Sequence, residues 1–532
     1  MIWSARTASR STTLRALTLS WTLSGILAAA TARAESGDDE QVRPPPGTPG
    51  STVDDEPVKP PPGTPGSTAP LPGADGSSSR RGAAVDGGKG AHAAVPKLPP
   101  EDRFQATAYS RTFVRLFRRR YLGGLGGEVT EDETIVPVYE YVGLRVIDAD
   151  APWGKDSLDL RLEGWGTVDA VDVSEDRRLT GDLVAANATG RFGPGYVTVG
   201  RQTAVGGAAR FTRFDGLMAG VRSSYGLGAD AYVGLAVTPR FHDRPEYVLL
   251  GSRADSMLKH PEALPSTSMT DAWLAGGKLS WSRAGRFHAA ASFHEEHERA
   301  GLARQWAAID ISGQPARSLS LGGTGAFDIF SAHLADADGY VDWEPIEQLG
   351  LSGEVTHSNP SLFLSRSSVL SVFSLDTLTE AGGEVTVRAI PRVQLGVSAW
   401  HDWYSDSTSS NRFGGRIRAG WGPRDALVAQ IRYARVEESE KGYHAVRGAI
   451  AYRVVEPVVA TVELHEYLYD VAVHGVDSAT YGSTTVEYGA AKQPWKLMLG
   501  GFMTRSPFAA MDAQAIARLS YDIDLATGAT TP

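Results

Sequence analysis

The chain has 532 residues with 59 glycines and no cysteine, and its formal net charge is −10 at pH 7. The absence of cysteine excludes disulfide frameworks, thiolate metal sites and cysteine nucleophiles, and the acidic balance argues against a nucleic-acid partner. No run of about 18 apolar residues occurs beyond the N-terminal region, so we expect no helical membrane span in the rest of the chain.

The N-terminal residues have the pattern of a secretory signal peptide. Basic residues precede an apolar run from Ala16 to Ala30, and Ala32-Arg33-Ala34 matches an A-x-A cleavage site. We expect residues 1–34 to be removed and the chain to leave the cytoplasm. The alternative is a retained anchor helix.

Residues 35–102 have the composition of a disordered linker. The segment Asp38–Thr52 (DDEQVRPPPGTPGST) recurs as Asp54–Thr68 (DDEPVKPPPGTPGST), a tandem repeat with a period of 16 residues. Proline, glycine, serine and alanine dominate this region, and such a composition buries too little apolar surface to fold. We interpret it as a periplasmic spacer or, alternatively, as a tether for an envelope partner.

From Arg103 onward apolar and polar residues alternate. In the segment 158–170, Leu160 and Leu162 alternate with Asp159 and Glu163, and the segment 513–525 behaves in the same way. This period of two indicates strands with one apolar face. A soluble β-sandwich would also alternate, but segments of about ten to thirteen residues suit tilted membrane strands.

Connection lengths alternate as they do in outer-membrane barrels, where short turns lie at one end and longer loops at the other. The short turns are Phe192-Gly193-Pro194, Ile390-Pro391-Arg392, Gly422-Pro423-Arg424, Glu456-Pro457 and Gln493-Pro494, and the longer connections include His242–Thr270, Asn359–Leu378 and Val471–Ser478.

We therefore predict that residues 103–532 form an all-β transmembrane antiparallel up-and-down β-barrel of about 18–20 strands, within a range of roughly 16 to 22. The weakest candidates are Leu302–Ile311 and Ser318–Phe327, which could instead belong to a long loop. An even strand number would place both ends of the barrel domain in the periplasm.

Placing the apolar positions toward lipid leaves many arginines facing the lumen. Arginine binds carboxylate and phosphate through a bidentate fork, and rings of arginine select for anions. The alternative is ordinary lining in which opposite charges pair across strands, since Glu384 and Glu463 would also face inward. The arginines expected on this wall are Arg388, Arg412, Arg416, Arg418, Arg432 and Arg447.

A second basic region lies between Gly195 and Arg222. Strict alternation would turn Arg201 toward lipid, which costs about 2–4 kcal/mol at the bilayer midplane. A bulge at Gly200 would turn Arg201 inward instead. We expect Arg201, Arg210 and Arg213 at a lumen constriction or its extracellular mouth, with Asp215 as a pairing partner.

This stretch resembles the alginate-export type of outer-membrane porin. The residues that carry the resemblance are Gly200-Arg201-Gln202, then Gly207, Arg210 and Arg213, then Phe214-Asp215-Gly216. The resemblance implies a Gram-negative outer-membrane barrel whose arginine-rich lumen passes an acidic polysaccharide outward, in contact with periplasmic polysaccharide-export proteins. The chain departs from the family in that Thr527–Pro532 follows the last strand, where such barrels usually end on an aromatic residue.

Three functions are compatible with the sequence. The first is export of an exopolysaccharide, with an anionic one favoured, and the second is uptake of small anionic or sugar solutes. The third is a plugged scaffolding barrel that binds envelope partners. We expect no enzyme, cofactor or metal site, because His294-Glu295-Glu296-His297 lacks HExxH spacing and residues three apart on a strand face opposite sides.

Overall fold

The computed structural model describes residues 104–123, 128–148, 157–170, 179–237, 272–283, 286–298, 301–359, 377–438, 441–490, 493–507 and 509–527. The expected signal peptide (1–34) and linker (35–102) lie outside the described residues, as does the connection 242–270. Within the part that is described, no helix is long and apolar enough to cross a membrane.

The described chain consists of β-strands and two 3₁₀ turns. The first strands are β1 (Phe104–Gly123), β2 (Glu128–Ile135), β3 (Pro137–Asp148), β4 (Leu158–Asp169), β5 (Leu179–Phe192), β6 (Gly195–Gly206), β7 (Arg210–Arg222), β8 (Leu227–Ala236), β9 (Trp273–Arg283), β10 (Phe287–Glu298), β11 (Gly301–Ala316) and β12 (Leu319–Asp328). The remaining strands are β13 (His333–Ile346), β14 (Leu349–Ser358), β15 (Leu378–Ile390), β16 (Val393–Tyr404), β17 (Ser409–Trp421), β18 (Leu427–Glu438), β19 (Tyr443–Val455), β20 (Val458–Val473), β21 (Val476–Tyr488), β22 (Trp495–Ser506) and β23 (Ala509–Thr527). The 3₁₀ turns are η4 (Gly207–Ala209) and η7 (Pro423–Asp425).

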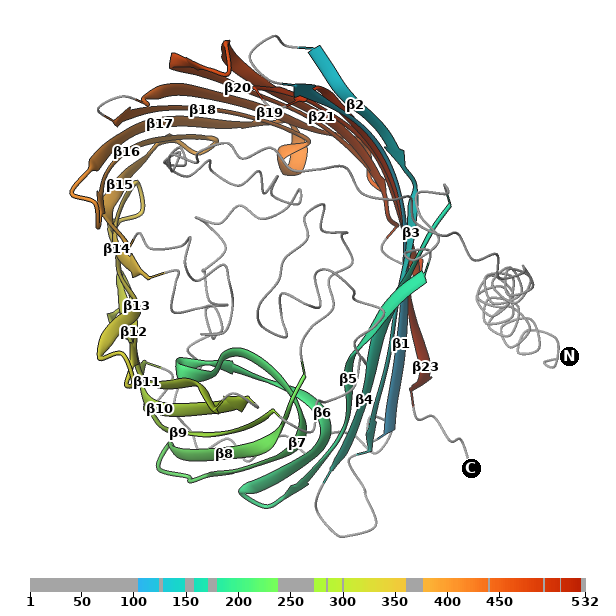
Figure 1. Ribbon diagram of the computed structural model, residues 1–532, viewed down its shortest axis with the longest axis vertical. Coiled ribbons are helices and arrows are strands. Elements are labelled where there is room, and N and C mark those ends of the chain that lie inside the picture. The colour runs from blue at the N-terminus through green and yellow to red at the C-terminus, as the bar shows by residue number, and fades with distance from the viewer. Residues whose placement is uncertain are drawn as a thin grey trace, which may run out of the picture. The chain divides into compact units, whose positions relative to one another are not determined.

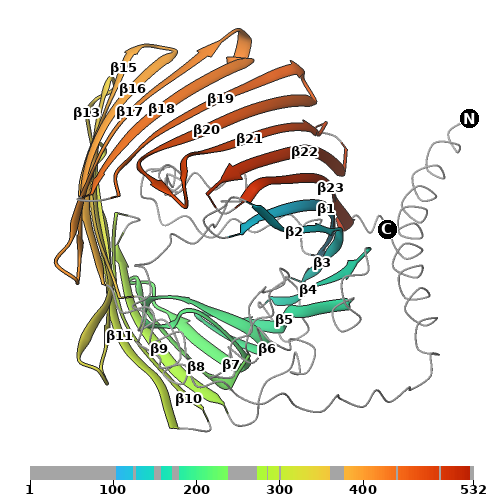
Figure 2. The same ribbon diagram turned by 45° about the horizontal axis from the view of Figure 1, so that its top comes forward.

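The strands close into an antiparallel barrel. From β3 onward each strand pairs with the next one in sequence, and β1 pairs with β3 on one side and β23 on the other. Strands β2 and β3 are two halves of one barrel strand interrupted at Val136, since both pair with β1. The wall therefore has 22 strands, arranged as a ring (Figure 1), and β15 to β23 run side by side in the turned view (Figure 2).

The outer face of this wall is apolar. On β4, Leu160 and Leu162 are about half exposed on the outside, whereas the alternating Asp159 and Trp165 are buried. The same alternation continues around the ring and leaves a belt of exposed aliphatic and aromatic side chains. An outward apolar belt on a closed antiparallel sheet is the structure of a transmembrane barrel.

The strand number lies at the upper limit of the predicted range. Both segments that the sequence left open are barrel strands, because Leu302–Ile311 belongs to β11 and Ser318–Phe327 overlaps β12. The prediction of a longer connection at Val471–Ser478 is wrong. Strands β20 and β21 continue to a two-residue turn at His474-Gly475. Polar residues such as Asp470, which suggested a loop, belong to the strand.

The two ends of the barrel differ in their connections. The predicted short turns lie at the end where β1 begins and β23 finishes, as Gln105 pairs with Thr527. We call this the short-turn end, and the opposite end, which includes the connection between β8 and β9, the long-loop end. All five short turns expected from the sequence are therefore at one end.

Adjacent threonines on β21 test the assignment of the two faces. We expect Thr484→Arg, which places a charge among exposed outer side chains, to destabilise the barrel by about 2–4 kcal/mol near the bilayer midplane. Thr485→Arg, on the inward face, should change the free energy of unfolding far less. Urea unfolding of the two variants in lipid vesicles measures both effects, and equal destabilisation would contradict the face assignment.

Candidate functional site

The expected wall arginines lie on inward positions of neighbouring strands. On β17, Phe413, Ile417 and Trp421 are about half exposed on the outer face. Arg412, Arg416 and Arg418 alternate with them and therefore face the lumen. Arg388 on β15, Arg432 on β18 and Arg447 on β19 occupy the same face by their register.

Several of these arginines form ion pairs with carboxylates on nearby strands, as expected if the lumen has an ordinary lining in which opposite charges pair. Such pairs are partly exposed, so each contributes only about 0–1 kcal/mol. The pairs are Arg412–Glu380 at 2.5 Å, Arg416–Glu384 at 2.5 Å, Arg447–Glu463 at 2.7 Å and Arg388–Glu344 at 3.5 Å.

Gly396 makes one of these contacts possible. The Arg416–Glu384 pair joins β17 to β15 over the intervening β16. A Cβ atom at Gly396 would lie 2.7 Å from both Arg416 Nε and Glu384 Oε1. The missing side chain thus leaves room for a salt bridge that spans three strands.

Four of these arginines lie beside one another on the wall. Arg416, Arg432 and Arg447 lie directly opposite one another in successive ladders, and Arg418 is exposed beside them. We call Arg416, Arg418, Arg432 and Arg447 the arginine row. Two of its members are paired with carboxylates, Arg416 with Glu384 and Arg447 with Glu463. Like charges on facing positions repel, and an anion between them would relieve this repulsion.

The other basic region belongs to a hairpin that leaves the wall. The β5–β6 ladder stops at the pair Ala186–Arg201, while β5 continues along β4. The facing glycines Gly200 and Gly216 lie at this point, and Gly200 has φ 112°. A Cβ at Gly200 would collide with the Ala186 carbonyl oxygen, so glycine is needed at this bend.

The prediction of a β-bulge at Gly200 is wrong. The register of β6 with β5 and with β7 continues through Gly200 without a shift. A positive φ angle, rather than an extra residue, redirects the chain there. The side chain of Arg201 nevertheless lies away from lipid and is only 5% exposed.

Buried ion pairs hold the base of this hairpin. Arg201 donates two hydrogen bonds to Asp215, from Nε at 2.7 Å and from Nη2 at 2.8 Å, which confirms the expected pairing. Arg201 also lies 3.9 Å from Asp182 on β5, and Arg213 forms a short ion pair with Asp182. The Asp182 side chain is fully buried, and these two arginines stabilise its charge.

The tip of the hairpin packs inside the barrel. The turn η4 contacts β10, β11 and β12, and in Figure 1 the tip lies within the ring of strands. The Ala208 N–H donates to Ser292 Oγ at 2.9 Å, and Arg210 forms an ion pair with Asp336 on β13. Ala208 is buried in an apolar cluster with Trp306, so the tip is fixed by both polar and apolar contacts.

Arg201, Arg210 and Arg213 therefore contact carboxylates that fasten the hairpin. Sequence reasoning missed two of those carboxylates, Asp182 and Asp336. Alternation alone places both on inward positions, but it does not show that the β6–β7 tip folds across the lumen to meet them.

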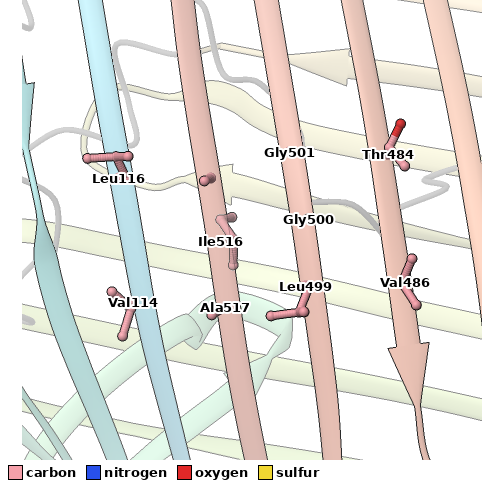
Figure 3. A pocket seen from close by; sticks show the side chains of 10 residues that line it. Val114, Leu116, Thr484, Val486, Leu499, Gly500, Gly501, Ile516 and Ala517 are labelled. Carbon is pink, nitrogen blue, oxygen red and sulfur yellow. The ribbon is translucent and has the colours of Figure 1, made fainter.

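A groove of about 470 Å³ lies on the membrane side of the wall, across β1, β23, β22 and β21. Figure 3 shows Val114, Leu116 and Leu499 around the glycines Gly500 and Gly501. Its lining is apolar and faces outward, so the groove is separate from the lumen.

The two histidines at the end of β10 have different partners on opposite faces of the strand. His294 is buried and hydrogen-bonds through Nδ1 to the Tyr232 hydroxyl at 3.0 Å, whereas His297 pairs with Glu295 at 2.5 Å on the other face. Among the described residues, no group of three or more histidine, aspartate or glutamate side chains is placed to hold a metal ion.

No protein-family model matches the sequence, and no curated protein matches it. Solved structures similar to the barrel include OccD3 (OpdP) of Pseudomonas aeruginosa, 9% identical with a TM-score of 0.38, covering 80% of this chain and 92% of that one. OccAB4 of Acinetobacter baumannii is 9% identical with a TM-score of 0.41, covering 80% and 100%. OpdK of Pseudomonas aeruginosa with vanillate is 10% identical with a TM-score of 0.36, covering 79% and 98%. At TM-scores below 0.5 these neighbours say nothing about what this barrel carries.

Removing the buried carboxylate should release the hairpin. We expect Asp182→Ala to destabilise the barrel by about 3–5 kcal/mol, because two buried arginines lose a counter-charge. Single-channel recordings should also show larger and noisier currents. Glu344→Ala, which breaks the exposed pair with Arg388, is the control and should cost at most about 1 kcal/mol. Equal effects of the two substitutions would show that the ion pairs at the hairpin base are dispensable.

Proposed function

We propose that this chain is an outer-membrane channel of a Gram-negative bacterium through which small hydrophilic anions diffuse. The observation that supports this proposal best is the arginine row, in which three arginines face one another in successive ladders on the lumen wall. The outward apolar belt supports a membrane location, and the short-turn end would face the periplasm.

The arginine row would act through weak, exchangeable contacts. An entering carboxylate or phosphate competes with Glu384 and Glu463 for guanidinium donors, and it can pass from one strand to the next because the arginines are adjacent. Each contact is partly exposed and screened by water, so it attracts an anion without trapping it.

The geometry favours small solutes over the polysaccharide that the sequence suggested first. The resemblance to alginate-export porins includes three arginines, Arg201, Arg210 and Arg213. All three form ion pairs with carboxylates, and the hairpin that carries them is packed inside the barrel. A long anionic polymer would need a continuous series of available arginines. The arginine row extends over three neighbouring strands, β17 to β19.

Neutralising two members of the row tests the proposal. In planar bilayers under a KCl gradient, we expect the double variant Arg418→Ala/Arg432→Ala to shift the reversal potential toward cation selectivity, because two positive charges are removed from the lumen wall. The control is Arg435→Ala, which removes an arginine from the outer face of β18 where it pairs with Asp470. The control should leave the reversal potential unchanged.

Other results would support other functions. A purified barrel that conducts no ions would favour the plugged scaffold. A conducting barrel blocked by an anionic polysaccharide from the short-turn side alone would favour export. An unchanged reversal potential in the double variant would contradict the role of the arginine row.

A further inference from the structure

A second set of lumen-facing side chains lies on β16 to β20, toward the long-loop end. Its members occupy directly facing positions in four successive ladders, in the order Trp400, Arg412, Val436, Tyr443 and Tyr469. We call this set the aromatic row. At about 4.8 Å per strand spacing, it extends over about 19 Å of the inner wall.

The rings of the aromatic row are held by their neighbours. The indole of Trp400 lies against Gly382, where a Cβ would come 2.6 Å from ring atoms. The Arg412 guanidinium carbon lies 5.4 Å from the Trp400 ring centroid. The Tyr443 centroid is 5.9 Å from that of Tyr467 and 6.4 Å from that of Tyr469.

Carboxylates lie along one side of these rings. Glu380, Asp402, Ser410 and Glu438 form the next row of facing residues. Asp402 is 8% exposed, and its Oδ2 accepts a hydrogen bond from Ser410 Oγ at 2.7 Å. The neighbouring Glu380 side chain is 23% exposed, and its Oε2 pairs with Arg412 at 2.5 Å. A ligand hydroxyl can donate to this partly exposed carboxylate.

The charge balance of this patch differs from that of the arginine row. Three carboxylates accompany the single guanidinium of Arg412, which is already paired with Glu380. The patch therefore disfavours the anions that the arginine row attracts. Aromatic faces combined with hydroxyl-directed acceptors suit an uncharged ligand with one apolar face and many hydroxyl groups.

We propose that the aromatic row is a binding site for neutral sugar rings in the channel. The C–H face of a pyranose carries partial positive charge and stacks on the negative face of an indole or phenol ring. Its hydroxyl groups donate to the partly exposed carboxylates of Glu380 and Glu438 and accept from Arg412. The length of the row accommodates an oligosaccharide rather than a single ring. This inference rests on the proposed channel function, because the sugar must enter the lumen.

Sugar-induced block of the current tests the site with the purified full-length barrel in planar bilayers and maltotriose as the probe. We expect maltotriose to block the current reversibly. Trp400→Ala and Tyr443→Ala should each raise the half-blocking concentration by up to about tenfold, because one stacking partner is lost. Trp400→Phe, which keeps a ring, should restore most of the block.

Aromatic residues that face outward on strands β16 and β18 provide matched controls. Trp403→Ala on β16 and Tyr433→Ala on β18 remove half-exposed aromatic rings from the outer face, and both should leave the sugar block unchanged.

Conduction without any maltotriose block would overturn the sugar site and leave the channel function intact. Equal block in Trp400→Ala and the unaltered protein would also overturn it. A block by tetramethylammonium, without one by maltotriose, would assign the rings to a cation and contradict the proposal. A barrel that does not conduct would refute the proposed channel function itself.

Discussion

The constraint on which the structure depends is that a bilayer offers no hydrogen-bond partners to the backbone. The chain satisfies it by closing 22 strands into a ring with no free edge. Closure fixes the alternation of each strand, because one face must meet lipid and the other must meet water. The positions of Arg416 and Trp400 follow from that alternation, so the chemistry of the lumen is a consequence of the wall.

The lumen uses charge in two ways. At Asp182 the carboxylate is buried between Arg201 and Arg213, where loss of one partner is costly. Along the arginine row the pairs are partly exposed and weak, and arginines face one another on neighbouring strands. The buried pairs fasten a folded-in hairpin, and under the proposed function the exposed ones exchange partners with solutes. Burial thus separates the arginines that hold the hairpin from those that line the lumen.

Much of the wall could be predicted from period-two alternation, including the inward orientation of Arg412, Arg416 and Arg432. The strand number was harder, because glycine-rich strands such as β12 carry a weak apolar signal. The inward fold of the β6–β7 tip could not be predicted, since alternation reports which face a residue occupies and not whether the strand stays in the wall. The aromatic row was missed for a related reason. Trp400 and Tyr443 are far apart in sequence, and only the register of four ladders makes them neighbours.

The closing ladder between β1 and β23 has a consequence for assembly. Arg115 and Gln514, which hydrogen-bond across this seam, are 399 residues apart in sequence. Before β23 is available, β1 and β22 each present an unpaired strand edge, which is prone to pairing with other chains. The earliest barrel strand must therefore wait for the last one, and loop-closure entropy makes such long-range pairing slow. A chaperone that shields the edge of β1 during this interval would protect the entire polypeptide from misassembly.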